Sequence, residues 1–232
     1  MESKTLAIIT ARGGSKRIPR KNIRDFLGHP IIEYSIKAAV NANCFDEIMV
    51  STDDREIAAI AETFGAVIPF YRSEATSNDL ATTSDVIEEV ICEYNKRGNT
   101  FQYCCCIYPT VPFITADRLK QGFDILQSTG SDSAIPVVRF SYPIQRALKT
   151  DDGRLSMIWP ENLNARSQDL MSAYHDVGQF YWFRVESFMK QKQLFMDYTV
   201  PIEIPESEVQ DIDNEEDWKI AEIKYKILKN IE

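Results

Sequence analysis

The chain has 232 residues, of which 44% are hydrophobic and 26% are charged, and its formal net charge is -9 at pH 7. This length is enough for one large domain, which buries roughly 70% of the surface that the unfolded chain exposes. No stretch approaches the ~20 consecutive apolar residues of a membrane span, and an acidic chain argues against non-specific nucleic-acid binding. We therefore expect no membrane partner and no nucleic-acid partner.

The N-terminal segment and the cysteines indicate the compartment. Met1 to Thr10 lack the charged start, apolar segment and small-residue cleavage site of a signal peptide. Cys104, Cys105 and Cys106 are consecutive, and because neighbours on a strand point to opposite faces they cannot form a mutual disulfide framework. The sequence has no CxxC motif and no metal-spaced Cys/His set. We expect a cytoplasmic protein whose consecutive cysteines act as small buried apolar residues.

Short apolar runs alternate with segments of helical period through the first 140 residues. The pattern predicts strands at 5–10, 46–52, 66–71, 101–108 and 133–138, and helices at 30–41, 54–64, 83–97 and 116–127. Thr83 or Ser84 is the expected N-cap of the third helix. Strands and helices alternating in this way imply right-handed crossovers and a largely parallel sheet with helices on both faces.

The pattern changes after Arg139. The segment YPIQRALKTDDGRLSMIWPE predicts an antiparallel hairpin around Asp152-Gly153, and strands are expected at 178–184 and 199–204. A final amphipathic helix is expected at 215–229, with core contacts from Trp218, Ala221, Ile223, Tyr225 and Leu228. We predict a single α/β domain over residues 1–232, a three-layer α/β/α fold in which residues 139–176 form a small antiparallel arm.

A basic loop follows the first predicted strand. It contains six cations in an acidic chain: Arg12, Lys16, Arg17, Arg20, Lys21 and Arg24. The loop is expected at the carboxyl edge of the sheet, where open α/β folds bind ligands, and Gly13 and Gly14 allow backbone N–H groups to approach phosphate oxygens. It is neither a Walker A motif nor GxGxxG. The loop favours phosphate binding, and a merely solvated basic face is the alternative.

A pair of acidic residues near the C-terminus is the second candidate site. On a strand, the carboxylates of Asp211 and Asp213 face the same side while Ile212 packs behind them. Magnesium bound through these carboxylates, substrate phosphates and water relieves their mutual repulsion. The alternative is that these acids belong to the first turn of the last helix, where the helix dipole favours negative charge. The residues alone do not decide between the two.

Several motifs resemble those of one enzyme family. Ala11 to Lys16, followed after four residues by Lys21-Asn22, match the ARxGSKxxxxKN nucleotide loop of the acylneuraminate cytidylyltransferases. The resemblance extends through STDD, FYRSEATSNDLATTSDVI, ARSQDL, YHDVGQFYW and EVQDIDNEEDW, so it covers nearly the whole chain. The ARSQDL, YHD and VQDID segments are similar to the branch that acts on pseudaminic acid. The resemblance implies a nucleotide-diphospho-sugar transferase-like (Rossmann-like) fold and transfer of CMP from CTP to the anomeric hydroxyl of a nonulosonic acid.

The resemblance also implies roles for individual residues. It assigns the triphosphate to Arg12 and Lys21, with Lys16 as a further catalytic cation and with the loop residues Gly13, Gly14 and Ser15. It assigns recognition of the cytosine to Asn22 and Arg72 and the lining of the base pocket to Ala81 and Thr83. It assigns magnesium to Asp211 and Asp213. Family members usually form homodimers in which the arm reaches across to the partner, so residues 141–159 are expected to complete a neighbouring sugar site.

The choice of sugar is expected to depend on a third set of residues. Arg166 matches a family arginine near the sugar and could bind the carboxylate of a 2-keto acid in a bidentate manner. The other predicted sugar-site residues are Tyr108, Gln145, Gln168, Tyr174, His175, Gln179 and Tyr181. The chain reads CIYPTVPFI where sialic acid enzymes typically read LQPTSPLR, so Tyr108 replaces a glutamine and the terminal arginine is absent. This difference favours pseudaminic acid over sialic acid.

Two kinds of alternative stay open. Within the family, the chain could serve N-acetylneuraminate or legionaminate, whereas the Lys21-Asn22 pair and the Ser15-Lys16 pair argue against a KDO enzyme. In another class, the chain could be a nucleotide-binding module without catalysis. The presence of both Asp211 and Asp213 beside an intact loop argues against that reading.

Overall fold

The computed structural model describes residues 4–231. Residues 1–3 and 232 of the predicted domain lie outside the described residues, and so do the first three residues of the segment in which no signal peptide was found. The strands are β1 (Thr5–Thr10), β2 (Asp25–Phe26), β3 (His29–Pro30), β4 (Glu47–Ser51), β5 (Tyr103–Ile107), β6 (Ser133–Arg139), β7 (Leu148–Asp151), β8 (Arg154–Met157), β9 (Tyr174–Asp176), β10 (Phe180–Arg184) and β11 (Thr199–Glu203). The α-helices are α1 (Ile31–Ala42), α2 (Arg55–Thr63), α3 (Glu74–Ser77), α4 (Thr83–Lys96), α5 (Ala116–Thr129), α6 (Val185–Gln191) and α7 (Glu215–Lys229).

The central sheet has the strand order β11-β6-β10-β5-β1-β4, and β9 pairs with β6 beyond this path. β1 is parallel to both β4 and β5, and β11 is parallel to β6. β10 runs antiparallel to β5 and β6, and β9 is antiparallel to β6. The prediction of a mostly parallel sheet is therefore confirmed. The two reversed strands are the return path of the chain from the arm.

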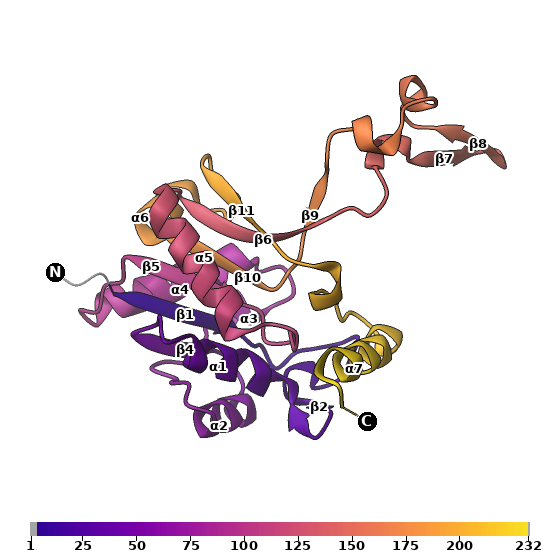
Figure 1. Ribbon diagram of the computed structural model, residues 1–232. Helices are drawn as coiled ribbons and strands as arrows, with labels where there is room; N and C mark the ends of the chain where they lie inside the picture. The colour runs from indigo at the N-terminus through magenta and orange to yellow at the C-terminus, as the bar shows by residue number, and fades with distance from the viewer. Residues whose placement is uncertain (1–3, 232) are drawn as a thin grey trace.

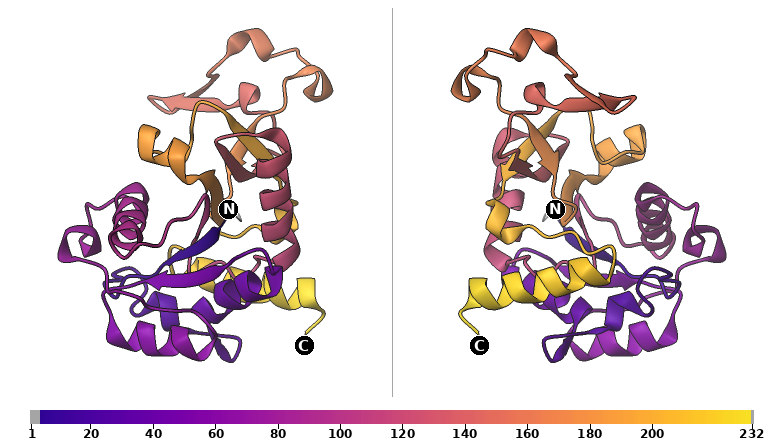
Figure 2. Two further views of the ribbon diagram at one scale, coloured as in Figure 1. Left: turned by 90° about the vertical axis from the view of Figure 1, so that its left-hand side faces the viewer. Right: turned by 90° about the vertical axis from the view of Figure 1, so that its right-hand side faces the viewer.

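Helices cover both faces of this sheet (Figures 1 and 2). On one face, Ala7, Ile9 and Cys105 pack with buried residues of α1, α2 and α5. On the other face, Leu6, Ile8 and the remaining two buried cysteines pack with α4 and α6. The alternation predicted for the cysteines is thus confirmed, and all five cysteines of the chain are free thiols. Burial raises the pKa of Cys106 to about 12.

Some details of the predicted elements are wrong. The run 66–71 forms only an isolated bridge from Val67 to Met49, because Pro69 lacks the N–H that would continue a strand. The N-cap of α4 is Thr82, neither Thr83 nor Ser84, and Thr82 forms a capping box with Asp85.

The predicted core contacts of α7 are partly wrong, and α6 was not predicted. Ile223 and Leu228 on α7 are exposed, at 60% and 37%, whereas Trp218 and Ala221 are buried as expected. α6 has no counterpart among the predicted elements, because its seven residues are too short to show a helical period.

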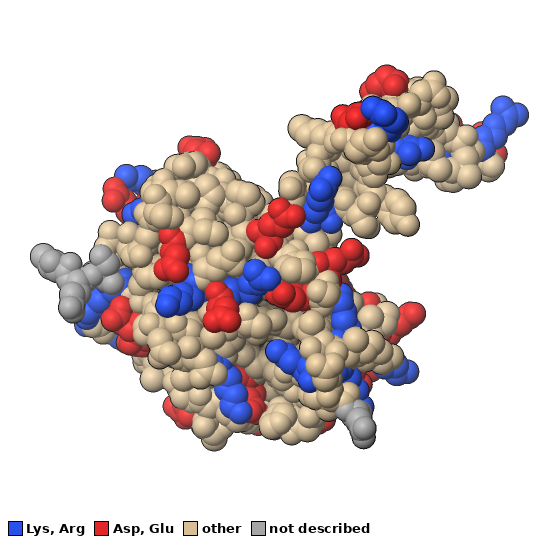
Figure 3. Space-filling view, in the orientation of Figure 1, with Lys and Arg blue, Asp and Glu red and all other residues tan. Residues whose placement is uncertain are grey.

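The arm is an antiparallel extension between β6 and β9. Its hairpin pairs β7 with β8, and the turn places Asp152 and Gly153 at φ of 44° and 75°, which is the left-handed region that such two-residue turns require. The arm extends away from the body of the molecule, at the opposite end from α2 (Figures 1 and 3). The hairpin prediction is confirmed.

A separate apolar cluster connects the basic loop to the C-terminal part of the chain. Ile18 and Phe26 pack with Ile212, Trp218 and other buried residues. Phe26 makes an edge-to-face contact with Trp218 at 5.6 Å between ring centres. This cluster holds the basic loop and the acidic segment on one side of the molecule. No helix within residues 4–231 combines the length and apolar character needed to cross a membrane.

Candidate active site

A pocket of about 400 Å³ opens where β1 and β5 end, at the sheet edge expected to bind ligands. It is lined by the basic loop, by the segment after β5 and by the acidic segment before α7. The lining residues are Thr10, Arg12, Ser15, Lys16, Arg17, Ile18, Lys21, Asn22, Tyr108, Pro109, Thr110, Val111, Gly178, Gln210, Asp211 and Asp213. The fold thus brings the basic loop and the acidic pair together.

The six cations of the loop divide into two groups. Arg12, Lys16, Arg17 and Lys21 line the pocket, whereas Arg20 and Arg24 do not. Arg20 pairs with Asp54 and, at 2.5 Å, with Glu56. Arg24 pairs with Glu215 at 2.5 Å, and its guanidinium lies 4.6 Å from the centre of the Trp218 ring. The last two arginines therefore fasten the loop to α2 and α7.

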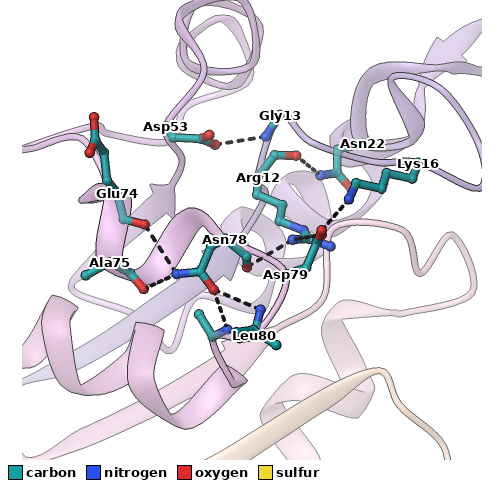
Figure 4. A network of polar contacts seen from close by, with 11 residues as sticks. Arg12, Gly13, Lys16, Asn22, Asp53, Glu74, Ala75, Asn78, Asp79 and Leu80 are labelled. Atoms are coloured by element: carbon teal, nitrogen blue, oxygen red, sulfur yellow. Dashed lines mark hydrogen bonds and ion pairs between the residues drawn. The ribbon is translucent and has the colours of Figure 1, made fainter.

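Arg12 and Lys16 converge on one carboxylate (Figure 4). The Nη1 atom of Arg12 donates to Asp79 Oδ1 at 2.9 Å and to the carbonyl oxygen of Asn78 at 3.1 Å. Lys16 donates to the other oxygen of Asp79. These contacts hold the pKa of Asp79 below its ordinary value. Because phosphate offers the same kind of oxygen acceptors as a carboxylate, both cations are placed where an anionic ligand could bind them.

Lys21 is a half-buried cation of the pocket. Its pKa is lowered because burial removes water from the ammonium group, although Asp213 and Asp211 lie near enough to oppose this effect. Asp213 instead forms an ion pair with Arg17 at 2.8 Å. Within residues 4–231, no carboxylate forms an ion pair with Lys21. The ammonium is thus poorly solvated and faces a pocket that can admit a negative ligand.

The glycines of the loop differ in their surroundings. The Gly13 N–H donates to Asp53 Oδ1 at 2.9 Å. This amide was predicted to approach a phosphate in the pocket, but in the structure it is directed at Asp53. A Cβ atom at Gly13 would lie 2.7 Å from Asp54 Oδ2, so only glycine fits against this carboxylate. A Cβ atom at Gly14 would meet nothing within 4 Å. Neither glycine is among the residues that line the pocket, whereas Ser15 is.

The four residues predicted to recognise or surround the cytosine of CTP differ in their relation to the pocket. Asn22 is buried, lines the pocket and donates from Nδ2 to the Arg12 carbonyl oxygen at 2.8 Å. Thr83 Oγ1 lies 3.2 Å from the hydroxyl of Tyr108, which lines the pocket. Arg72 and Ala81 do not line it. Arg72 is buried and donates to Ser51 Oγ at 3.0 Å and to its carbonyl oxygen at 2.7 Å, and burial lowers its pKa.

The acidic segment is not a strand, so that part of the prediction is wrong. Its alternation is nevertheless as expected, because Ile212 is buried while Asp211 and Asp213 line the pocket. The N-cap of α7 is Asn214, whose side chain accepts from the N–H groups of Glu216 and Asp217. The Asp213 carboxylate is therefore not the N-cap of α7; it lines the pocket, where it pairs with Arg17. No group of three or more His, Cys, Asp or Glu side chains in the described chain is arranged to hold a metal ion.

A second pocket of about 630 Å³ adjoins the first, and the two share Tyr108, Gly178, Gln210 and Asp211. Its other lining residues are Val138, His175, Asp176, Val177, Tyr181, Glu206, Val209 and Lys224. The Tyr181 hydroxyl donates to Asp176 Oδ2 at 2.6 Å, and burial raises the pKa of Tyr181. Two joined pockets with a common wall can hold two substrates side by side.

The predicted sugar residues are only partly brought together. Tyr108, His175 and Tyr181 line the second pocket, and Gln179 is buried behind it, donating to the Glu208 carbonyl oxygen at 2.7 Å. The others lie on the arm and do not line the second pocket within one chain: Gln145, Arg166, Gln168 and Tyr174.

The arm residues have partners of their own. Arg166 pairs with Asp169 at 2.8 Å, and Gln145 donates to the Met171 carbonyl oxygen at 2.8 Å. Gln168 lines a separate pocket at the base of the arm. Tyr174 is 43% exposed on β9.

Sequence reasoning missed three residues of the site. Asp79 organises Arg12 and Lys16, Asp176 accepts from Tyr181, and Lys224 lines the second pocket. Asp79 lies more than 60 residues from the cations it contacts, so no local spacing indicates the contact. Asp176 could have been found from its position in the YHD segment. Lys224 lies on the predicted final helix, where a lysine is ordinarily read as a solvent-exposed residue.

Comparisons with known proteins give consistent results. A family model described as cytidylyltransferase matches residues 6–217. The chain is 39% identical to the pseudaminic acid cytidylyltransferase of Campylobacter jejuni over 97% of both chains. It is 34% identical to the CMP-N,N'-diacetyllegionaminic acid synthase of Legionella pneumophila over 94% of both chains. Among solved structures, it resembles a CMP-2-keto-3-deoxy-manno-octonic acid synthetase complexed with CTP, with a TM-score of 0.69, 16% identity and coverage of 99% and 100% of the two chains. That last likeness concerns the fold.

Proposed function

The chain belongs to the cytidylyltransferase family, and from this we propose that it transfers CMP from CTP to the anomeric hydroxyl of pseudaminic acid, giving CMP-pseudaminic acid and pyrophosphate. The observation that carries the proposal is the 39% identity to a pseudaminic acid cytidylyltransferase over 97% of both chains. The two joined pockets support it, because the reaction needs two substrates in contact. We propose that the reaction takes place in the cytoplasm, where CTP is made.

In this proposal the first pocket binds CTP. Arg12, Lys16 and Lys21 hold the triphosphate, and Asp79 gives up its contacts with the first two when the phosphates bind. Ser15 donates to a phosphate oxygen, and Gly13 allows the loop to pack closely against Asp54. The cytosine is recognised by Asn22 and Arg72, and Ala81 and Thr83 line the base pocket. A buried polar base edge left unpaired costs about 1–3 kcal/mol, so fixed donors and acceptors are required there.

Asp211 and Asp213 are the residues that would hold magnesium. They fit this ion because both carboxylates line the pocket while Ile212 is buried between them, and because magnesium is usually bound by one or two carboxylates with substrate phosphates and water. When bound, magnesium would neutralise negative charge on the phosphate oxygens.

The proposed reaction is a single in-line displacement. The oxygen of the anomeric C2 hydroxyl forms a bond to the α-phosphorus of CTP, the hydroxyl proton is released, and the bond from the α-phosphorus to pyrophosphate breaks. Arg12, Lys16 and Lys21 stabilise the negative charge that grows on the bridging and leaving oxygens. Such preorganised electrostatics usually supply the largest contribution to catalysis.

The second pocket is proposed to bind the nonulosonic acid through Tyr108, His175, Gln179 and Tyr181. The arm residues Gln145, Arg166, Gln168 and Tyr174 do not reach it within one chain. We propose that the protein is a homodimer in which the arm supplies these residues to the partner's pocket, with Arg166 binding the sugar carboxylate. Exposed apolar side chains on the arm support this, including Tyr142 at 85%, Met171 at 80% and Leu155 at 68%.

The proposed function is tested by pyrophosphate release from CTP with pseudaminic, legionaminic and N-acetylneuraminic acids assayed in parallel. The proposal predicts magnesium-dependent release with kcat/KM highest for pseudaminic acid. Release that is highest with legionaminic acid, the substrate class named for the 34% identical relative, would leave the reaction standing and overturn the choice of sugar. CTP binding without release in any of the three reactions would identify a non-catalytic nucleotide-binding module.

A further inference from the structure

Part of the common wall of the two pockets is formed by residues 210–211, which belong to no helix or strand. A short 3-10 helix, η5 (Glu206–Glu208), leads through Val209 and Gln210 to Asp211. Gln210 and Asp211 line both pockets. Because residues 209–213 belong to no helix or strand, other contacts must fix the direction in which Asp211 points.

One set of contacts fixes Glu208. The Nε and Nη2 atoms of Arg118 on α5 donate to the two carboxylate oxygens of Glu208, each at 2.9 Å. The two side chains are only 24% and 22% exposed. Gln179, just before β10, donates to the carbonyl oxygen of the same residue at 2.7 Å. A bidentate ion pair of this kind fixes orientation as well as distance.

A second set of contacts comes from α7. The Nζ atom of Lys224 donates to the Glu206 carbonyl oxygen at 2.8 Å and to the Val209 carbonyl oxygen at 2.5 Å. The ammonium also lies 6.0 Å from the centre of the Phe113 ring. An ammonium group has three donors, and Lys224 uses two of them on the main chain that leads to Asp211. Lys224 therefore differs from the solvated lysines on the exposed side of the helix.

We propose that Lys224 and the Arg118–Glu208 pair are positioning residues that direct Asp211 into the nucleotide pocket, and that the affinity of the site for a divalent cation depends on them. This inference rests on the proposed function, which assigns Asp211 and Asp213 to the metal. A site with only two protein carboxylates depends strongly on their orientation, because no third ligand corrects a displaced one. Loss of a group that orients a metal ligand typically lowers metal affinity by 10- to 100-fold.

The test measures Mn²⁺ binding in the absence of turnover. Free Mn²⁺ is followed by electron paramagnetic resonance during titration of the full-length protein with CTP present and the sugar acid omitted. We expect Lys224→Met and Arg118→Met each to raise the Kd for Mn²⁺ by ~10-fold or more. Lys190→Met and Arg97→Met are matched controls, since they remove ion pairs with Glu186 on α6 and Glu93 on α4, and we expect an unchanged Kd.

A charge exchange separates positioning from general stabilisation. Arg118→Glu is expected to weaken Mn²⁺ binding, and Arg118→Glu combined with Glu208→Arg is expected to recover at least part of it, because the ion pair is restored with opposite polarity. Thermal unfolding monitors the fold of every variant. A lower Tm with an unchanged Kd in the Lys224 and Arg118 variants would overturn the inference, as would a double variant that binds Mn²⁺ no better than the single one.

The wild-type protein distinguishes this inference from the proposed function. Wild-type turnover together with Mn²⁺ affinities unaltered by the variants would refute the positioning role alone. A wild-type protein that neither binds Mn²⁺ with CTP nor releases pyrophosphate would refute the proposed function, and the positioning role with it.

Discussion

Replacing Lys21 with methionine should have opposite effects on stability and on activity. In the structure without ligand, the ammonium is half-buried, its pKa is lowered by burial, and no ion pair within the described residues compensates it. Lys21→Met keeps the volume of the side chain and removes this poorly solvated charge. When no interaction offsets the free-energy cost of desolvating a buried charge, removing that charge often leaves the stability of the fold unchanged or increases it. We therefore expect the free energy of unfolding to stay constant or to rise by about 1 kcal/mol.

The expected loss of activity is much larger. If the Lys21 ammonium binds the triphosphate and the leaving pyrophosphate, its removal resembles the loss of a preorganised donor, which costs ~10²- to 10³-fold in turnover. At 1.36 kcal/mol for each factor of ten, this corresponds to about 2.7–4 kcal/mol of transition-state stabilisation. If Lys21→Met leaves the fold at least as stable but greatly slows turnover, the buried ammonium of Lys21 serves ligand binding and not the stability of the fold.

The assay combines urea unfolding with steady-state pyrophosphate release, and Lys21→Arg is the matched variant that keeps the charge. Because burial lowers the pKa of Lys21, its charge is lost at a lower pH than the 10.5 of an ordinary lysine. The KM for CTP should therefore rise on the alkaline side earlier than for an exposed lysine, and Lys21→Arg should abolish that rise. Normal turnover by Lys21→Met would show that Lys21 does not bind the triphosphate, and a loss of several kcal/mol in stability would show that its ammonium stabilises the fold.

Three further predictions concern the frame of the site. Gly13→Ala would bring a Cβ atom to 2.7 Å from Asp54 Oδ2, so the carboxylate must move from its place at the N-terminus of α2. We expect urea unfolding to show that the free energy of unfolding falls by about 1 kcal/mol. Unchanged stability would contradict the close contact. The hydrogen bond from Arg20 holds the pKa of Asp54 at about 2, so the pair stabilises the fold above the ordinary aspartate pKa of 3.8 and loses this effect as the pH falls toward 2. Because Arg20 is 39% exposed, we expect only about 1 kcal/mol between the wild type and Arg20→Met at pH 6. The difference should shrink as the pH falls through 2, and a difference independent of pH would refute the coupling. Burial raises the pKa of Cys106 to about 12, so the thiols of Cys104–106 should not react with Ellman's reagent at pH 8 until the protein is unfolded, and their rapid reaction in the native protein would contradict the packing of β5.

Local sequence signals were sufficient for most of the fold. Thr5–Thr10 forms a strand and Glu215–Lys229 a helix with the predicted bounds, because an unbroken apolar run and a capped amphipathic run are each decided within their own residues. The hairpin at Asp152-Gly153 was predictable for the same reason, since both residues tolerate positive φ. The antiparallel direction of β10 was not, because a buried strand has the same apolar sequence whichever way it runs.

The site was predictable where a motif supplies its residues and not where the fold brings distant residues together. The loop residues Arg12, Lys16 and Lys21 and the pair Asp211 and Asp213 line one pocket, as expected from two motifs about 190 residues apart. The contact of Asp79 with two of the loop cations depends on the path of the chain after α3 and has no local pattern.

The sugar side was the least predictable part of the site, because it depends on the arm. Within one chain, Arg166 pairs with Asp169 and stands away from the pocket that it was expected to complete.

The most direct test of the account is ³¹P nuclear magnetic resonance of CTP incubated with the protein, magnesium and pseudaminic acid. We predict that the three CTP signals decline together and are replaced by pyrophosphate and one phosphodiester signal in equal molar amounts, and that omission of the sugar acid leaves CTP intact. Release of inorganic phosphate in place of pyrophosphate, or consumption of CTP without the sugar acid, would contradict the transfer of CMP to the anomeric hydroxyl.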